Sequence, residues 1–307
     1  MFQYIVRRAI SAVPTLILIT LLVFAMLHLV PGDPAAIFLG ENRSTPELLA
    51  QVRADMGLDR PLHEQYLSFV GGILRGDLGR SLTNKREVSR EIAARLPHTI
   101  ELTVAALAVA IVVGVGLGVL SALKHNSWID NLAMIIALVG VSMPVFWSSL
   151  LLIFFFSVQL QWFPAFGEGG ISRLVLPAFA LGMVSAATLA RLVRSSMLDV
   201  LSQDYVRTAV SKGVRPRVVV MRHALKNALI PTITVIGIQF GNLVSGAVIT
   251  ETIFGRLGIG RYYVESLLAK DFPVVQSLTL LIAVVYVTIN LLVDISYSFI
   301  DPRIRYE

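Results

Sequence analysis

The sequence predicts an all-α membrane protein with six transmembrane helices and both termini in the cytoplasm. Hydrophobic residues make up 55% of the 307 residues and charged residues only 15%, whereas soluble domains carry about a quarter charged residues. Six apolar stretches approach or exceed the roughly 20 residues that a membrane-spanning helix requires. Cysteine is absent, which excludes disulfides, thiolate metal sites and cysteine nucleophiles.

The six apolar stretches define the expected spans and a division into two parts. The spans are 9–30, 100–123, 132–158, 174–192, 228–249 and 274–300. The first follows Arg7 and Arg8 but is longer than the hydrophobic core of about 7–15 residues in a signal peptide, and no small-residue cleavage site follows it. We expect an uncleaved anchor helix with an extracytoplasmic loop (1–98) and a five-helix core (99–300).

The positions of Lys and Arg orient the chain, because short cytoplasmic loops are enriched in these cations. With the N-terminus inside, the cations expected on the cytoplasmic side are Arg7, Arg8, Lys124, Arg191, Arg194, Arg207, Lys212, Arg215, Arg217, Arg222, Lys226, Arg303 and Arg305. The short outer loops hold only Arg173, Arg256, Arg261 and Lys270. The long segment between the first two spans is not counted, since long segments cross the membrane largely regardless of charge.

The long outer segment is expected to fold. Thr45, Pro46 and Glu47 supply the cap, the first-turn proline and the acidic residue that typically begin a helix, and Gly57 is suited to ending it. Two further apolar stripes follow Pro61 and lead into the second span. Their apolar faces require a partner, which is the span ends, the membrane surface or an external protein.

The stretch 205–231 is a basic break between two apolar spans, with six Lys/Arg and no Asp or Glu. Its first residues place apolar side chains on one helix face and polar ones on the other. Gly213 suits the left-handed residue that ends a helix, and Pro216 suits the first turn of the next helix. The sequence therefore predicts a short amphipathic helix at about 202–213, a turn, and a basic helix that enters the fifth span.

This short helix, which Ser202 or Asp204 can cap, cannot be stable alone in water. Its apolar face must be buried against another surface. The residues alone leave three readings: contact with anionic lipid, a simple consequence of the positive-inside bias, or a knob that docks on a cytosolic partner.

The basic stretch resembles the signature loop of inner-membrane permeases in ATP-binding-cassette (ABC) importers. That loop has Glu-Ala-Ala, three residues, Gly, and later Ile-x-Leu-Pro. Here Arg207-Thr208-Ala209 precedes Gly213 at the same spacing, and Leu229-Ile230-Pro231 matches the ending loosely. The Arg-Thr pair and the longer spacing to the proline depart from the general pattern. Both departures resemble the peptide/nickel branch, whose loop reads much like DYVRTAxxKG, here Asp204 to Gly213.

Other segments resemble the same branch in order and spacing across nearly the whole chain. They are Pro14-Thr15, Pro31-Gly32-Asp33-Pro34, Gly76-Asp77-Leu78-Gly79-Arg80-Ser81, Glu251-Thr252-Ile253-Phe254, Gly258-Ile259-Gly260, Lys270-Asp271-Phe272-Pro273 and Asp301-Pro302-Arg303-Ile304-Arg305-Tyr306. Each motif is short, and the resemblance rests on the set.

The resemblance implies a type I ABC importer permease fold in the bacterial cytoplasmic (inner) membrane. The short helix would fit a cleft on a cytosolic ATPase, through Asp204, Tyr205, Arg207, Thr208, Ala209 and Gly213. The implied partners are a second, homologous but distinct permease, two ATPase subunits, an extracytoplasmic substrate-binding protein and membrane lipid, with no nucleic acid. This chain would hold no cofactor and would not be an enzyme, since ATP and Mg would bind the partner ATPases.

The implied cargo is a di- or oligopeptide, with a nickel chelate or glutathione as alternatives in the same branch. No GxxxxGK[ST] phosphate-binding loop occurs in the sequence, so the chain cannot bind ATP by that route. Gly114, Gly116 and Gly118 lie inside an apolar span and indicate close helix packing.

Polar residues inside the spans are candidates for the translocation path, because such groups usually face protein or water. Gln239, Asn242 and Ser245 lie near the middle of the fifth span. They either join helices by hydrogen bonds or line the path. An ion-driven secondary transporter is the alternative of a different class, but it would favour mid-membrane carboxylates and internal repeats. A membrane enzyme would need paired catalytic residues, which the sequence does not offer.

Overall fold

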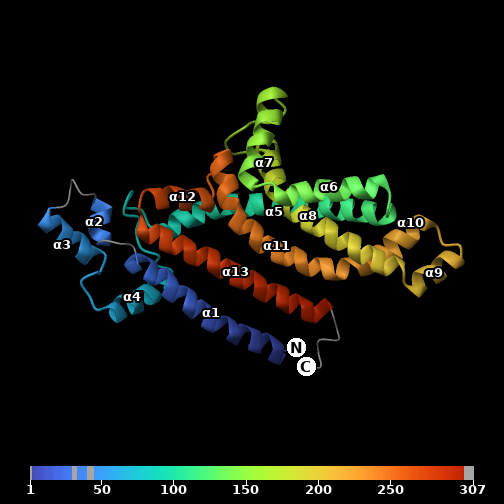
Figure 1. Cartoon of the computed structure of the whole chain (residues 1–307). Helices are drawn as coiled ribbons and strands as arrows, with labels where there is room; N and C mark the ends of the chain where they lie inside the picture. The colour runs from blue at the N-terminus through green and yellow to red at the C-terminus, as the bar shows by residue number, and fades with distance from the viewer. Residues whose placement is uncertain (1, 30–32, 40–44, 301–307) are drawn as a thin grey trace. The chain divides into compact units, whose positions relative to one another are not determined.

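The computed structural model describes residues 2–29, 33–39 and 45–300, and Figure 1 shows a chain of helices. The α-helices are α1 (Phe2–Leu29), α2 (Pro34–Leu39), α3 (Pro46–Asp55), α4 (Leu62–Leu74), α5 (Val88–Leu123), α6 (Trp128–Ser142), α7 (Val145–Leu152), α8 (Ile171–Leu201), α9 (Asp204–Ser211), α10 (Pro216–Val218), α11 (Leu225–Phe254), α12 (Ile259–Leu268) and α13 (Phe272–Ile300). Two π-helical segments, Ile153–Gln159 and Val219–Ala224, follow α7 and precede α11.

The chain divides into two compact units. The first comprises His98–Leu257 and the described residues from Ile289 onward, and the second comprises the described residues of Phe2–Pro97 and Gly258–Thr288. The helices α5 and α13 each contribute to both. The two-part division expected from the sequence remains a prediction about domains. The expected division between residues 98 and 99 lies one residue from the boundary of the compact units between Pro97 and His98.

Five helical stretches are long and apolar enough to cross a membrane: Val6–Leu29, Val88–Leu123, Ile171–Leu201, Pro216–Phe254 and Phe272–Ile295. They correspond to the first, second, fourth, fifth and sixth expected spans. The third expected span is not one helix, since α6 and the stretch that begins with α7 meet at an angle of 109°. The described residues therefore hold five spans, or six if this bent pair counts as one.

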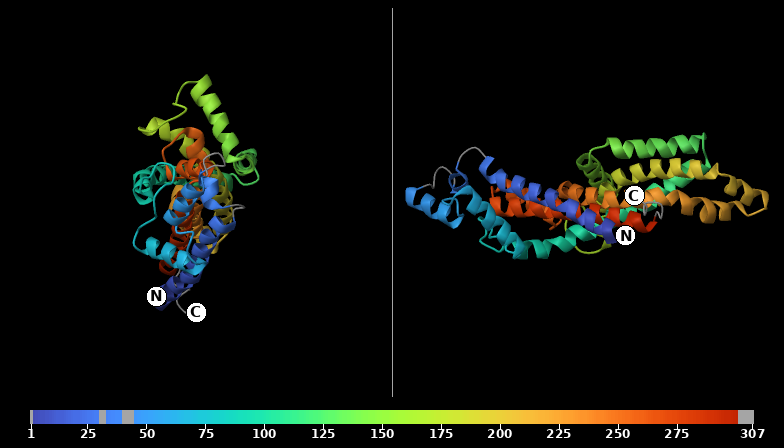
Figure 2. Two further views of the ribbon diagram at one scale, coloured as in Figure 1. Left: turned by 90° about the vertical axis from the view of Figure 1, so that its left-hand side faces the viewer. Right: turned by 90° about the horizontal axis from the view of Figure 1, so that it is seen from below.

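The bend in the third span has a local cause at Pro144. A proline lacks the backbone N–H that a continuous helix needs, and it pushes the preceding residue out of the helical region. Met143 accordingly adopts an extended conformation with ψ of 126°. Figures 1 and 2 show α7 turning away from α6 at this point.

The first unit packs α5, α6 and α11 against α8, and small residues allow the closest approach. A Cβ atom added at Gly114 or Gly118 would lie 2.7 Å from a carbonyl oxygen of α8, and one added at Gly182 would lie 2.5 Å from a carbonyl oxygen of α5. Small residues allow membrane helices to gain packing contacts at short range. The expected packing role is thus confirmed for Gly114 and Gly118, whereas Gly116 is exposed and has nothing within 4 Å.

A buried carboxylate joins α5, α6 and α8 near one end of the first unit. Asp130 at the start of α6 is 3% exposed, and Arg194 of α8 donates from Nε and Nη2 to its two oxygens, both at 2.8 Å. Ser121 of α5 donates to the same carboxylate, as does the backbone N–H of Asn126 at 3.0 Å. A two-pronged Arg–carboxylate pair fixes orientation as well as distance, so we call Asp130, Arg194 and Ser121 the clamp.

The second unit contains the amphipathic helices expected in the long outer segment. Thr45 caps α3 by accepting from the N–H of Leu48 at 3.3 Å, and Gly57 has the left-handed φ of +67° after that helix. The helix α4 begins directly after Pro61, and the third stripe continues without a break into the second span as α5. Of the motifs that carried the resemblance, 31–32 and 301–306 lie outside the described residues.

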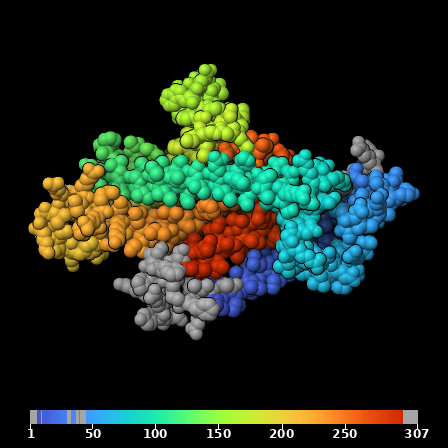
Figure 3. Space-filling model, turned by 180° about the vertical axis from the view of Figure 1, so that it is seen from behind, coloured from blue at the N-terminus to red at the C-terminus, as the bar shows by residue number. Residues whose placement is uncertain are grey.

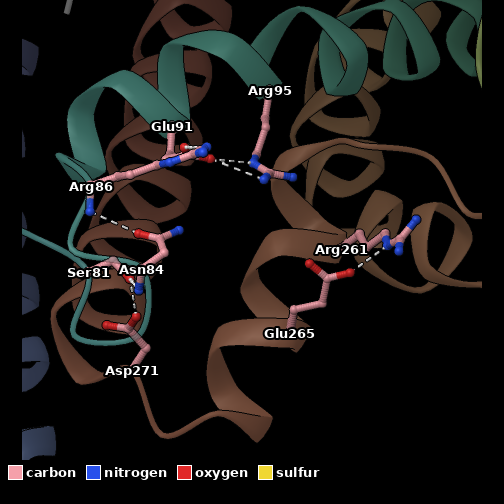
Figure 4. Close-up of polar contacts among 8 residues, drawn as sticks. All are labelled: Ser81, Asn84, Arg86, Glu91, Arg95, Arg261, Glu265 and Asp271. Carbon is pink, nitrogen blue, oxygen red and sulfur yellow. Dashed lines mark hydrogen bonds and ion pairs between the residues drawn. The ribbon is translucent and has the colours of Figure 1, made fainter.

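Two of those motifs meet within the second unit. Asp271, just before α13, accepts from Ser81 Oγ at 2.5 Å and from the backbone N–H groups of Leu82 and Thr83 at 3.1 and 3.2 Å (Figure 4). Ser81 and Asp271 are 190 positions apart and both are 2% exposed. The carboxylate therefore ties the loop before α5 to the connection between α12 and α13.

The start of α5 is held by a second polar group and by an apolar core. Arg86 and Arg95 both donate to Glu91, at 3.0 and 3.1 Å (Figure 4). The Arg95 guanidinium lies 4.4 Å from the ring centroid of Tyr262 in α12. Burial, together with the nearby charges of Glu91 and Asp271, raises the pKa of Tyr262 to about 12. Below these groups, Val88 and residues of α12 and α13 form one buried apolar cluster.

The glycine contacts give a matched pair of substitutions. Gly118→Ala places a methyl group against α8, and overpacking of this kind costs about 1–3 kcal/mol. Gly116→Ala adds the same atom where space is open and raises helix propensity, so it is neutral or slightly stabilising. Thermal unfolding of the detergent-purified protein measures both. Equal melting temperatures for the two variants would contradict the packing described above.

The clamp gives a second prediction. Asp130→Asn removes the charge that neutralises Arg194 and lowers stability by about 2–3 kcal/mol. This is less than the roughly 3–5 kcal/mol of a fully buried pair, because the Arg194 side chain is 26% exposed. The control is Glu87→Gln, which breaks the exposed pair with Arg90 (41% and 83% exposed) and costs under about 1 kcal/mol. A melting temperature for Asp130→Asn as high as that of the control would show that the clamp carries no stability.

Candidate functional site

The expected basic knob exists in the structure as α9 and the turn that follows it. The helix α9 lies between the end of α8 and the start of α10, at the end of the first unit where α8 and α11 meet (Figures 1 and 2). Figure 3 shows this region as exposed surface, coloured yellow to orange at the left edge. We call the segment from Gln203 to Ala224 the elbow.

The ends of α9 are set by its sequence, although not by the cap that was expected. Gln203 is the N-cap residue and makes no side-chain capping bond. Ser202 instead ends α8 and donates to Asp199 O at 2.8 Å, and Asp204 is the first helical residue of α9. Capping by Ser202 or Asp204 was therefore wrong, because the preceding helix extends to Leu201 and uses Ser202 for its own end.

The turn after α9 requires glycine. Gly213 has φ of +73°, a left-handed conformation that costs a residue with a side chain about 1–2 kcal/mol. Its N–H donates to Val210 O at 2.9 Å, and the N–H of Val214 donates to Ala209 O at 3.2 Å. These two bonds form the Schellman motif that closes a helix C-terminus. The expected role of Gly213 as a helix terminator is confirmed.

The elbow is attached to α8 and to the start of α11. Val206 is 3% exposed and forms the buried side of α9. Tyr205 Oη accepts from Asn227 Nδ2 at 2.8 Å, and Asn227 Nδ2 also donates to His223 O at 3.2 Å. Helical structure continues from Pro216 through the π-helical segment to Phe254. A displacement of α9 is therefore transmitted to α11 through Tyr205, Asn227 and the covalent chain.

The exposed side chains of the elbow are both apolar and cationic. Val210 is 59% exposed, Met221 57% and Tyr205 44%. The exposed cations on the same segment are Arg207, Lys212, Arg215, Arg217 and Arg222. The acidic partner within α9 is Asp204, which lies 4.0 Å from Arg207, but both side chains are largely exposed and such a pair contributes little. The elbow thus presents apolar side chains surrounded by positive charge.

The expected contact residues lie on α9 and at its C-terminal end. Thr208 is exposed and donates to Asp204 O at 2.8 Å, and Ala209 is half-buried. The structure brings Asp204, Tyr205, Arg207, Thr208 and Ala209 together on one short helix with Gly213 at its end. Whether these residues contact another protein remains a prediction.

The expected path residues lie partly in a cavity between α7, α8 and α11. The cavity has a volume of about 450 Å³, and Gln239 and Asn242 line it. Asn242 Nδ2 donates to Gln239 Oε1 at 2.9 Å along α11. Ser245 is one turn further on and is not among the residues that line the cavity. Its Oγ donates to Gly241 O at 3.5 Å.

Two further polar residues in this cavity were not foreseen. Ser185 and Thr188 of α8 line it opposite the amides of α11. A lone serine or threonine in an apolar helix carries little sequence signal, because its hydroxyl commonly bonds the carbonyl of the preceding turn. The clamp was also missed: its two charged residues are 64 positions apart, and no local pattern links them. The described residues hold no cluster of three or more His, Asp or Glu side chains suited to a metal ion.

The chain is similar over its full length to transport permeases. It is 45% identical to the dipeptide transport system permease protein DppB of Alkalihalophilus pseudofirmus, with 100% of both chains covered. It is 43% identical to the glutathione transport system permease protein GsiC of Pectobacterium atrosepticum and 42% identical to the di/tripeptide transport system permease protein DppB of Pseudomonas aeruginosa, again with complete coverage.

Solved structures show a similar fold. An inward-facing structure of the MetNI methionine ABC transporter matches with a TM-score of 0.55 and 18% identity, covering 68% of this chain and 96% of that one. An amino acid ABC transporter crystallised with histidines matches with a TM-score of 0.50 and 19% identity, covering 70% of this chain and 94% of that one. The fold is therefore that of ABC transporter membrane subunits.

Two family descriptions cover almost the whole sequence. The N-terminal part of binding-protein-dependent transport system membrane components matches residues 1–103, and the inner membrane component itself matches residues 114–306. Together with the full-length relatives, this confirms the resemblance seen in the elbow and the scattered motifs. The chain belongs to the family of binding-protein-dependent transport system inner membrane components.

Proposed function

We propose that this protein is a permease subunit of an ABC importer that moves di- or oligopeptides across the bacterial cytoplasmic membrane. Family membership and the apolar helices support a multi-pass membrane permease. The full-length relatives that are named dipeptide and di/tripeptide permeases support the peptide cargo. The observation that carries the mechanism is the elbow, whose exposed side chains are apolar and cationic.

The elbow couples ATP hydrolysis to transport in this proposal. A cytosolic ATPase subunit receives α9, with Val210 and Tyr205 entering its cleft and Arg207 among the flanking charges. Because α9 is bonded to Asn227 and linked by a short turn to the helical stretch Pro216–Phe254, closure of the ATPase pair moves α11. That helix carries Gln239 and Asn242 on the cavity, so the movement changes access to the path.

The proposed assembly contains a second permease, two ATPases and an external binding protein. The family name supports the binding protein, and the ABC transporter structures with a similar fold support the ATPases. In this proposal both termini and the elbow face the cytoplasm, which the excess of Lys and Arg expected on that side supports. ATP and Mg²⁺ bind the ATPases, and this chain catalyses no reaction itself.

Glutathione is the second candidate cargo, since one of the full-length relatives carries that name. Glutathione is itself a tripeptide, so both candidates share the same chemistry. A nickel chelate has no support beyond the likeness of the elbow to the peptide/nickel branch. An ion-driven carrier would use the membrane gradient instead of ATP, and it would have no use for a docking elbow.

Purification of the importer from cells tests the proposal. The tagged chain should co-purify with a second permease and ATPase subunits. After reconstitution into proteoliposomes with its binding protein, it should take up a labelled dipeptide only when ATP is present on the ATPase side. Uptake that continues without the ATPase and follows an imposed ion gradient would refute the proposal in favour of a secondary transporter.

A substitution at the elbow tests the coupling directly. Gly213→Val forces a β-branched residue into the left-handed region at a cost of about 1–2 kcal/mol, which reorients α9. Peptide uptake should fall at least about tenfold, while the helices still insert. Either ATP hydrolysis continues without uptake, or the ATPases no longer co-purify.

The matched control is Gly57→Val, since Gly57 has a similar φ of +67°, with open space around it, in the second unit. It introduces the same backbone strain away from the elbow, and coupling should be retained. Normal coupled uptake by Gly213→Val, or equal uncoupling by both variants, would exclude a specific role for the elbow.

A further inference from the structure

The cavity in the first unit is lined by apolar and uncharged polar side chains, and this lining limits which ligands can bind there. Its walls are formed by Val145 of α7, by Leu181, Val184, Ser185 and Thr188 of α8, and by Val235, Ile238, Gln239, Asn242, Leu243 and Gly246 of α11. Among these described residues there is no charged side chain. An ionised group passing through gains no ion pair here, so the cavity has no basis for selecting cargo by charge.

The polar groups of the cavity come from two helices. The two amides, Gln239 and Asn242, belong to α11, and the two hydroxyls, Ser185 and Thr188, belong to α8. The bond from Asn242 to Gln239 uses one donor and one acceptor. Each amide side chain has two N–H donors and an oxygen that can accept two bonds, so both retain donor and acceptor capacity. No other hydrogen bond of these two side chains is found in the described part of the chain.

The hydroxyls of Ser185 and Thr188 are likewise available to hydrogen-bond a ligand. Ser185 is only 4% exposed, yet its Oγ is not one of the fully enclosed polar atoms that lack a partner. Neither Ser185 nor Thr188 has a side-chain hydrogen bond within the described residues. A buried helix hydroxyl such as that of Ser185 usually finds a partner, and Thr188 is partly buried beside the same cavity, so both groups are placed to bond a molecule that occupies the cavity.

We propose that this cavity is a subsite for the peptide main chain, in which Gln239 and Asn242 bond a peptide group and Ser185 and Thr188 bond the main-chain polar group next to it, which in a dipeptide is a terminal carboxylate or ammonium. A peptide group offers one N–H donor and one C=O acceptor, which matches the mixed capacity of a side-chain amide. The apolar wall accommodates side chains of varied shape, and the volume of about 450 Å³ lies within the usual range for small-molecule sites. The subsite therefore recognises what all peptides share. This inference rests on the proposed function and deepens it.

The experiment compares two ligands that differ in one group. The assembled importer, in proteoliposomes with its binding protein and ATP, is supplied with alanyl-alanine or with its ester analogue, which lacks the main-chain N–H. Receptor affinity is measured separately, and both ligands are used at saturating concentrations. The wild type should take up the dipeptide about three- to tenfold faster, the size expected for one hydrogen bond. Gln239→Leu and Asn242→Leu should slow the dipeptide to the rate of the ester.

Two further variants keep the test decisive if Gln239→Leu does not assemble. Thr188→Val preserves shape and removes only the hydroxyl, and it should slow dipeptide uptake about threefold. Asn242→Asp places a charge in the cavity at an exposed position, and uptake of alanyl-glutamate should become at least about threefold slower than uptake of alanyl-lysine. Thr232→Val is the control, because Thr232 lies on the same helix, its hydroxyl donates to Ala228 O at 3.3 Å and it does not line the cavity, and uptake by this variant should match the wild type.

The outcomes separate this inference from the proposed function. A wild-type importer that moves no peptide at all refutes the proposed function. A wild type that moves the dipeptide and the ester equally well, or leucine variants that keep the wild-type ratio, refutes the subsite while leaving peptide import intact. An unchanged ratio of alanyl-glutamate to alanyl-lysine in Asn242→Asp would likewise show that cargo does not pass this side chain.

Discussion

The close packing of helices on α8 is the constraint on which the rest of the first unit depends. In a bilayer the lipid tails are as apolar as the side chains, so contact at short range, rather than release of water, holds helices together. Gly114, Gly118 and Gly182 allow that contact between α5 and α8. The clamp then fixes α6 to the same pair, and α11 packs along α8. The cavity and the elbow are both built on this group.

Local patterns predicted most of the helices and the order of helix, turn and helix in the elbow, but neither the cap of α9 nor the π-helical segment. Hydrophobic length alone located five spans, and Gly213 and Pro216 marked the two sides of the turn after α9. The third span was wrong as a single helix, although Pro144 was visible in the sequence. A count of apolar residues ignores the backbone N–H that a proline lacks, and the bend in the third span follows from the missing N–H of Pro144. Gly116 differs from its two neighbours because it lies on the opposite face of α5, as a spacing of two residues implies, whereas the spacing does not show which face packs against α8.

Long-range pairs could not be predicted in the same way. Ser81 and Asp271 were noticed as parts of two separate motifs, but nothing local indicates that one carboxylate accepts three bonds from the distant loop. Likewise Gln239 and Asn242 stood out because amides are rare in hydrocarbon, whereas Ser185 and Thr188 became candidates only when α8 was placed beside α11. Residue type can mark a polar side chain as a candidate for the cavity. Only the packing of a second helix shows whether that side chain lines it.

None of the described residues that line the cavity is charged, and this has a consequence for how such importers diversify. If the cavity binds only the peptide main chain, as proposed, it imposes no ranking among cargoes that differ in their side chains, and discrimination is left to the receptor that delivers them. Exchange of that receptor alone would then let the same permease transport a new range of substrates, with no compensating change in α8 or α11. A lineage could thus acquire new nutrients by duplicating one small soluble gene and keeping its permease.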